Sequence, residues 1–133
     1  MHSVHISHAR RLSAVAGLAA IVASLTAWRT PFFHLHLLKS IPEANATVPA
    51  APDSIRLWFS QAPELKLTTL KVTGPGNAAV PLTPLASRDS AALVAGVRAK
   101  LSSGAYTVSW RTMARDGHVA SGNFAFSVVP VRR

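Results

Sequence analysis

Beyond residue 40, apolar and polar residues alternate in short runs. Alternation with a period of two predicts strands with one buried face, because successive side chains of a strand point to opposite sides of the sheet. The runs that show this pattern are 55–59, 70–73, 93–97, 106–111 and 124–128. Between them, residues 84–92 are the one stretch in which we expect a helical turn.

Proline and glycine separate these runs, for example at Pro63, at Gly74-Pro75-Gly76 and at Gly104. Short strands at fairly even spacing, with turn residues between them, are typical of β-sandwiches and β-barrels. We therefore predict an all-β fold of about seven strands: a Greek-key β-sandwich or barrel, immunoglobulin-like or cupredoxin-like.

The segment from Leu101 to Tyr106 adds a local prediction. Its Leu-x-x-Gly-x-Tyr pattern is typical of a tyrosine corner, in which the tyrosine hydroxyl bonds to the backbone a few residues upstream. The alternative is a tyrosine that only packs in the core. We favour the corner, which would fix a crossover between the two sheets.

The composition narrows the class of protein. A chain of 133 residues is long enough for a leader and one domain of about 100 residues. The formal net charge is +9, but the basic residues are scattered and are not interleaved with aromatic residues, so we expect no nucleic-acid partner. The absence of cysteine from the sequence excludes disulfides and thiolate metal sites.

The N-terminal part has the layout of an export signal. Arg10 and Arg11 precede an apolar run from Leu12 to Trp28, and the segment contains no acidic residue. We predict a signal peptide over residues 1–33, a domain over 34–130 in the periplasm, and a tail over 131–133. The alternative is an uncleaved N-terminal membrane anchor, although the run is somewhat short of the about 20 residues of a full span.

Two pairs of side chains that can bind metals stand out in the domain. His34 and His36 are two residues apart, so on an extended first strand both imidazoles share one face. Asp116 and His118 have the same spacing around Gly117, whose conformational freedom suits a tight loop. Taken alone, a solvated turn or an ordinary strand surface would explain either pair. If the first strand lies beside the loop, three or four nitrogen and oxygen ligands converge.

The donor types indicate which metal such a site would take. Imidazole and carboxylate without thiolate favour copper(II) or zinc(II) over copper(I). A histidine at a free N-terminus suits copper(II) well, because its α-amine and its ring nitrogen form a chelate. Cleavage just before His34 would create that group.

Three segments resemble the CopC family of periplasmic copper-binding proteins: 34–46, 55–61 and 104–124. The resemblance extends over nearly all of 34–129. It implies a Greek-key β-sandwich with a copper(II) site that serves copper tolerance or uptake, often beside a CopD-type inner-membrane protein. By position, it implies that His34, Asp116 and His118 are ligands, with His36 as a fourth ligand or a neighbour.

The sequence departs from the family pattern in two places. Pro31-Phe32-Phe33 is not the small-residue site that signal peptidase prefers, and a cut after Ala27 would leave Trp28 at the start and deprive His34 of its free amine. Binding would then depend more on His36. Met113 is the one methionine besides the start residue, so we predict no separate copper(I) site.

Two tryptophans and one arginine have expected roles. Trp110 lies on the apolar side of its run and is predicted to be core. Trp58 lies on the opposite side from its apolar neighbours, so it contacts a partner or is covered by a loop. Arg115 stands beside Asp116, where it would lower the pKa of the carboxyl group, but we favour an exposed loop arginine.

The leading functional hypothesis is a monomeric copper(II) carrier or buffer in copper resistance, which passes copper to a membrane partner. An enzyme, a copper mono-oxygenase with a histidine brace, is the first alternative; it would need an open coordination position and a substrate-binding face. A metal-free adhesion or chaperone-like sandwich is the second, because a fold alone does not define a function. We expect a binding protein rather than an enzyme.

Overall fold

The computed structural model describes residues 34–130. Eight strands and two short 3₁₀ helices make up this part of the chain. The strands are β1 (Leu37–Ile41), β2 (Thr47–Val48), β3 (Ser54–Phe59), β4 (Thr69–Thr73), β5 (Ala86–Asp89), β6 (Ala92–Gly96), β7 (Gly104–Met113) and β8 (Val119–Val128), and the helices are η1 (Leu65–Leu67) and η2 (Pro75–Asn77). Residues 34–130 contain no helix that is long and apolar enough to cross a bilayer.

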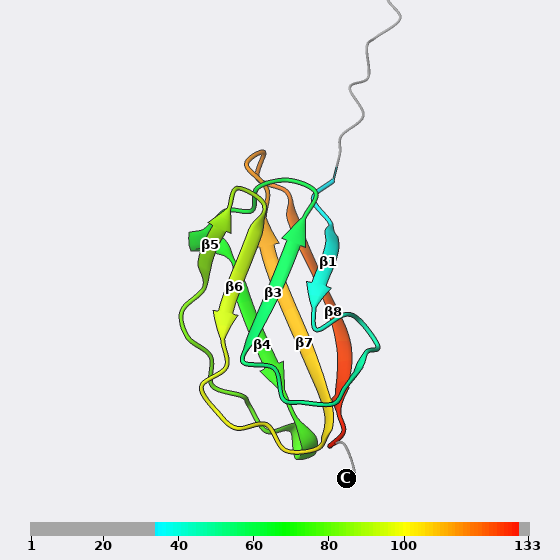
Figure 1. Ribbon diagram of the computed structural model, residues 1–133. Helices are drawn as coiled ribbons and strands as arrows, with labels where there is room; N and C mark the ends of the chain where they lie inside the picture. Colours follow the sequence, from blue (N-terminus) through cyan, green and yellow to red (C-terminus); the bar gives the residue numbers. More distant parts are fainter. Residues whose placement is uncertain (1–33, 131–133) are drawn as a thin grey trace, which may run out of the picture. The chain divides into compact units, whose positions relative to one another are not determined.

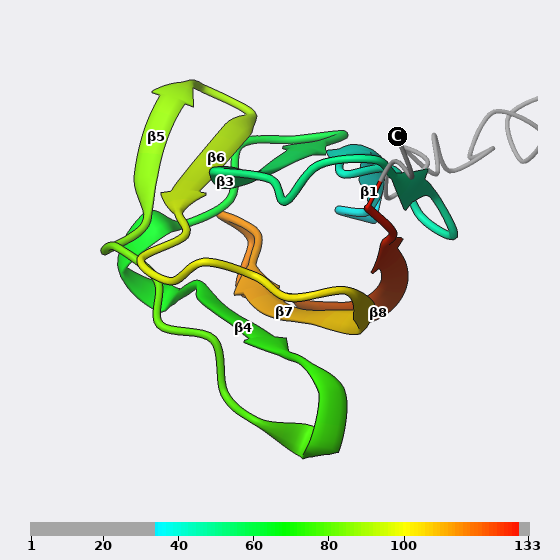
Figure 2. The same cartoon turned by 60° about the horizontal axis from the view of Figure 1, so that its bottom comes forward.

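The strands form two sheets of four that pack face to face (Figures 1 and 2). The first sheet has the order β1-β3-β6-β5, and the second has the order β2-β8-β7-β4. All strand pairs are antiparallel except β2 with β8. Since the chain crosses repeatedly between the sheets, the all-β sandwich predicted from the alternating runs is confirmed.

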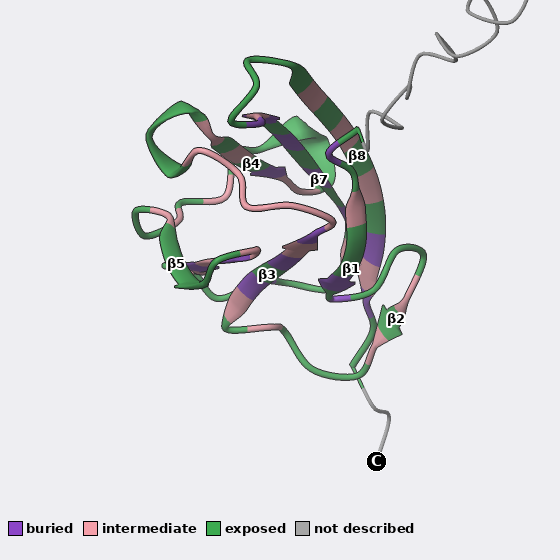
Figure 3. Cartoon of the chain, turned by 90° about the horizontal axis from the view of Figure 1, so that it is seen from above, coloured by how far each residue is buried: buried purple, intermediate pink, exposed green. Residues whose placement is uncertain are grey.

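The core lies between the two sheets, where Figure 3 shows the buried residues of the strands. Alternate residues of β3 and β7 point inward, so burial follows the predicted period of two. The side chains with almost no exposed surface are Phe59, Phe126, Ile55, Leu57, Val72, Val108 and Thr112. Trp110 is buried as expected and meets Phe59 edge to face, with ring centroids 5.2 Å apart.

The predicted helical turn within residues 84–92 is wrong. Residues 86–89 form β5, a short edge strand that pairs with β6. All four of its residues are exposed, so no alternation of apolar side chains marks it in the sequence. Hydrogen bonding to β6, rather than burial, determines its conformation. The two-residue β2 was likewise not anticipated; residues 34–130 form eight strands, where about seven were expected.

The tyrosine corner is present. The Tyr106 hydroxyl donates a hydrogen bond of 2.8 Å to the backbone carbonyl of Ser102, four residues upstream. The ring itself is buried and stacks on Phe126, with centroids 5.4 Å apart. This bond ties the loop before β7 to the start of that strand, as the Leu-x-x-Gly-x-Tyr pattern predicted.

Candidate metal centre

His34 and His36 lie in an extended segment immediately before β1, rather than on the strand itself. Leu35, between them, is buried in the core, so His34 and His36 are both exposed and point away from the core. The His36 backbone N–H donates to Ser60 Oγ at 3.0 Å, and the Ser60 backbone N–H donates to the His36 carbonyl at 2.9 Å. The end of β3 therefore positions the segment.

Asp116 and His118 lie in the loop between β7 and β8. The buried Ala114 anchors this loop: its N–H donates to the His118 carbonyl at 2.9 Å, and its own carbonyl accepts from Gly117 at 2.9 Å. Gly117 has a φ of +87°, a conformation that a residue with a Cβ rarely adopts. The loop is consequently a tight turn that presents a carboxylate and an imidazole to solvent.

The fold brings these two segments together. Figure 1 shows the start of β1 and the β7–β8 loop at the same end of the sandwich. The rings of His34 and His118 are perpendicular, with centroids 6.1 Å apart. Below them, a groove of about 670 Å³ runs between the N-terminal segment and β8, lined among others by Leu35, His36 and Trp110. His34 therefore lies beside the loop that carries Asp116 and His118.

Asp116 contacts His118 through both carboxylate oxygens. The His118 backbone N–H donates to Oδ1 at 3.1 Å, and the ring Nδ1 lies 2.9 Å from Oδ2. The pKa of Asp116 lies below its ordinary value, first because of the backbone hydrogen bond from His118 and then because of the bond from the ring. Arg115 does not contribute: it is exposed and lies beside Glu64, with 3.9 Å between Nε and Oε1.

The hydrogen bonds of the His118 and His36 rings also indicate which ring nitrogen carries a proton. An ionised carboxylate only accepts, so His118 Nδ1 carries a proton, and in the neutral ring Nε2 keeps its lone pair. His36 Nδ1 lies 2.9 Å from the carbonyl oxygen of His34, which assigns the same tautomer to that ring. A hydrogen-bonded Nδ1 with a free Nε2 is the usual state of a metal-binding histidine.

In the part of the chain that the structure describes, no three His, Cys, Asp or Glu side chains are grouped closely enough to hold one ion as they stand. His34, His118 and Asp116 still fit such an ion, because their side chains are free to turn. The side chains of His118 and Asp116 are 63% and 53% exposed, so rotation about their torsions disturbs no core packing. His36 contacts the His34 carbonyl and Ser60 rather than the loop.

Ser60 holds the 34–36 segment in place, a role that its sequence position does not reveal. Besides its bonds to His36, its hydroxyl lies 3.4 Å from the His34 carbonyl. Its role follows from the pairing of β1 with β3, in which Leu37 lies opposite Phe59. No spacing rule links residues 34 and 60 in the sequence, so this contact could not be predicted from it.

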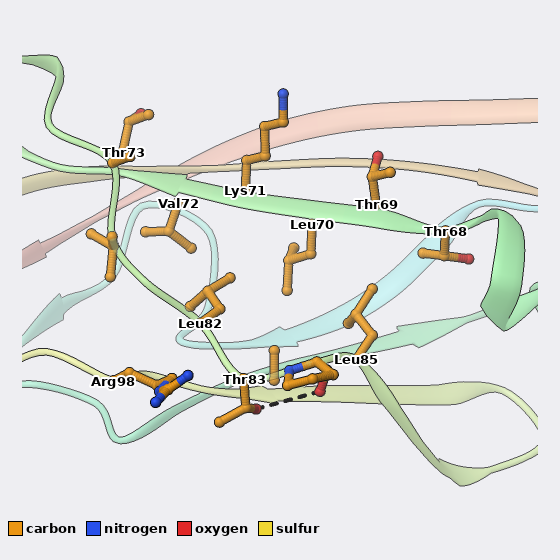
Figure 4. A pocket seen from close by; sticks show the side chains of 14 residues that line it. Thr68, Thr69, Leu70, Lys71, Val72, Thr73, Leu82, Thr83, Leu85 and Arg98 are labelled. Carbon is orange, nitrogen blue, oxygen red and sulfur yellow. Dashed lines mark hydrogen bonds between the residues drawn. The ribbon is translucent and has the colours of Figure 1, made fainter.

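A second hollow, of about 830 Å³, lies along β4 on the opposite side of the sandwich from β1. Figure 4 shows that Leu70, Val72, Leu82 and Leu85 face it, with Arg98 at its border. Its lining contains no histidine or carboxylate. It is an apolar gap between the sheet edges and offers no ligands to a metal.

The CopC domain model matches residues 37–129, and the chain belongs to the CopC family. The match begins three residues after His34, so both N-terminal histidines precede it. The fold and the loop around Asp116 and His118 lie within it. The family resemblance stated from the sequence is thereby confirmed.

Individual relatives agree with this assignment. The chain is 37% identical to Protein YobA of Escherichia coli K12 over 115 residues, covering 84% of this chain and 90% of that protein. It is 34% identical to Copper resistance protein C of Xanthomonas campestris pv. juglandis over 123 residues, covering 86% and 94%. Among solved structures, PcoC, a methionine-rich copper resistance protein from E. coli, matches with a TM-score of 0.66 and 33% identity, covering 72% and 99%.

Proposed function

We propose that this chain is a periplasmic copper(II) carrier or buffer that binds one ion between its N-terminal histidine and the β7–β8 loop. The observation that carries the proposal is the approach of the His34 and His118 rings, which are far apart in the sequence but have centroids 6.1 Å apart. Relatives named for copper resistance support copper as the cargo.

The donor set suits copper(II). His34, Asp116 and His118 offer imidazole nitrogen and carboxylate oxygen, and the sequence has no cysteine to favour copper(I). Asp116 can bond to His118 and still bind a cation, since an ionised carboxylate has about four acceptor positions. Asp116, whose pKa is lowered by the hydrogen bonds from His118, is ionised at neutral pH. His36, with Nε2 free, is the fourth ligand or a neighbour of the site.

The starting residue of the mature chain decides how strong the site is. If cleavage exposes His34, its α-amine and ring together chelate the ion. Residues 1–33, which hold the proposed signal, lie outside the described part of the structure. A chain that begins at Trp28 is expected to bind copper(II) more weakly than one that begins at His34, because it has lost the chelating amine.

A copper(II) competition titration tests the site. We compare the chain that begins at His34 with His118→Ala, Asp116→Asn and the control Asp89→Asn. Asp89 is a matched control, because its carboxylate also accepts a backbone N–H two residues on, at 2.9 Å, but on β5. The two site variants are expected to lose at least about tenfold in affinity, and the control none. Unchanged affinity of His118→Ala would sink the assignment.

In this proposal the protein binds and delivers copper and is not an enzyme. It acts as a monomer and passes the ion to a CopD-type inner-membrane protein. Size-exclusion chromatography with and without copper tests the monomer, and copper transfer to membranes that contain such a protein tests delivery. A copper-loaded chain that retains its ion in the presence of those membranes would argue for buffering rather than transfer.

A further inference from the structure

The outer face of the first sheet carries an amphiphilic group of side chains that copper binding does not use. Register places Lys39 opposite Trp58, and Ile41 opposite Arg56, on the side away from the core. Trp58 is half-buried, and Lys39 Nζ lies 5.2 Å from its ring centroid. The sequence left open whether Trp58 contacts a partner or is covered by a loop. In the described structure it lies on an open sheet face, which is turned toward the viewer in Figure 1.

Beside Trp58 the face is hollowed. A depression of about 350 Å³ is lined by Arg56, Trp58, Arg88, Asp89, Ala92, Leu93 and Val94. Ala92 and Val94 lie opposite Trp58 and Arg56 on the neighbouring strand, so they form an apolar floor. Two guanidinium groups and an indole therefore surround a hollow whose base is aliphatic.

The charge of this face is predominantly positive. At the hollow, Arg56 and Arg88 stand against the carboxylate of Asp89, whose Oδ1 already accepts the Ala91 N–H at 2.9 Å. Beside it, Lys39 lies near the carboxylate of Glu43, so the cations outnumber the acids by three to two. Within residues 34–130, neither guanidinium forms an ion pair. An arginine fork binds phosphate oxygens with two parallel hydrogen bonds, so free guanidiniums at a hollow suit a phosphate group.

Exposed aliphatic side chains adjoin the cations. Ile41 is 41% exposed and shares the face with Arg56, and Leu38, on the same strand, is 63% exposed. An acidic protein segment would account for the arginines but not for these side chains. An anionic bilayer accounts for both, because tryptophan and aliphatic groups enter the interface while Lys and Arg contact headgroup phosphates.

We propose that the outer face of the β1-β3-β6-β5 sheet is a docking surface for an anionic phospholipid membrane. Trp58 and Ile41 enter the headgroup region, and Arg56 and Arg88 bind lipid phosphates around the hollow. The metal centre lies at the end of the sandwich rather than on this face, so a docked molecule keeps its histidines accessible.

Vesicle co-sedimentation tests the proposal on the chain that begins at His34. This part is expected to fold alone, since residues 34–130 enclose one hydrophobic core and the solved PcoC chain corresponds to this region over 99% of its length. Vesicles contain phosphatidylglycerol and phosphatidylcholine, or phosphatidylcholine alone. Wild type is expected to bind only the anionic vesicles and to be released by high salt, which screens exposed charges.

Arg56→Gln/Arg88→Gln is expected to bind anionic vesicles about 30-fold more weakly. The control Lys71→Gln/Arg111→Gln makes the same charge change on the exposed face of the second sheet and is expected to lose less than about threefold, since those side chains lie away from the membrane. Equal losses in the two variants would reduce the binding to general charge attraction and overturn the proposal. Near-UV circular dichroism verifies that each variant is folded.

Fluorescence gives a second readout that needs no charge variant. In the chain that begins at His34 the tryptophans are Trp58 and the buried Trp110. Lipids with brominated acyl chains are expected to quench wild type but not Trp58→Phe. Absence of quenching in wild type would contradict the proposal. Failure to bind anionic vesicles, together with tight binding to polyglutamate, would assign this face to an acidic protein instead.

Discussion

Replacing Leu35 by alanine is expected to weaken copper binding without touching any ligand. Leu35 is the one side chain of the 34–36 segment that is buried, and it lies between the two histidines. Two hydrogen bonds between His36 and Ser60 complete its attachment to the domain. The segment therefore docks through one apolar contact and a short piece of backbone pairing.

The free-energy gain and the free-energy cost of docking this segment are close to equal. Burial of the leucine contributes about 2 kcal/mol, and each of the two hydrogen bonds contributes about 1 kcal/mol. Fixing the backbone of three residues costs about 1–1.5 kcal/mol for each one. The gain and the cost are nearly equal, so loss of the leucine is expected to lower the docked fraction from about one half to about 3%. Copper affinity then falls about 15-fold.

The assay is a chelator competition for copper(II), together with hydrogen exchange at the His36 and Ser60 amides. Leu35→Met conserves volume and should stay close to wild type. Val72→Ala is the control for general destabilisation, because Val72 is buried in β4, remote from the β1 edge. The reasoning fails if Leu35→Ala binds copper as tightly as wild type, or if Val72→Ala weakens binding equally.

Three further variants test other parts of the account. In Gly122→Ala the new Cβ would lie 2.8 Å from the Trp110 ring, so we expect a loss of about 1–3 kcal/mol in urea unfolding; wild-type stability would mean that the ring shifts freely. Tyr106→Phe removes the bond to Ser102 and should cost about 1 kcal/mol, visible in the same assay. The native pKa of Asp116 is lowered, so its stabilising contribution is full above the ordinary carboxyl pKa and disappears as pH falls through the native value. Asp116→Asn should thus be less stable than wild type at pH 6 and equal to it in strong acid, and a difference that persists unchanged into strong acid would contradict this.

The long central strands could be predicted from the sequence because burial alone determines their pattern. Along β3 and β7 every second side chain enters the core, and the apolar residues record this directly. β5 has no buried residue and β2 has only two residues, so neither leaves such a record. Their conformation depends on hydrogen bonds to neighbouring strands, and those strands lie beside them only once the sheet has formed.

The candidate site divides in the same way. The chemistry of Asp116 and His118 is local, since one tight turn joins the two side chains, and the sequence shows it. The approach of His34 to that turn depends on the packing of Leu35 and on the register of β1 with β3. The residue types suggested that His34 approaches Asp116 and His118. The distance between the His34 and His118 rings, however, follows from the fold and not from the sequence.

Paramagnetic broadening by copper(II) reports which residues lie close to the bound ion. In an NMR spectrum of the chain that begins at His34, substoichiometric copper(II) broadens signals of residues close to the ion. The account predicts that the ring signals of His34 and His118 and the signals of Asp116 disappear together, in proportion to a single equivalent of copper. If His34 signals are lost at the same copper(II) concentration in wild type and in His118→Ala, the ion binds only the N-terminus, and the shared site is contradicted.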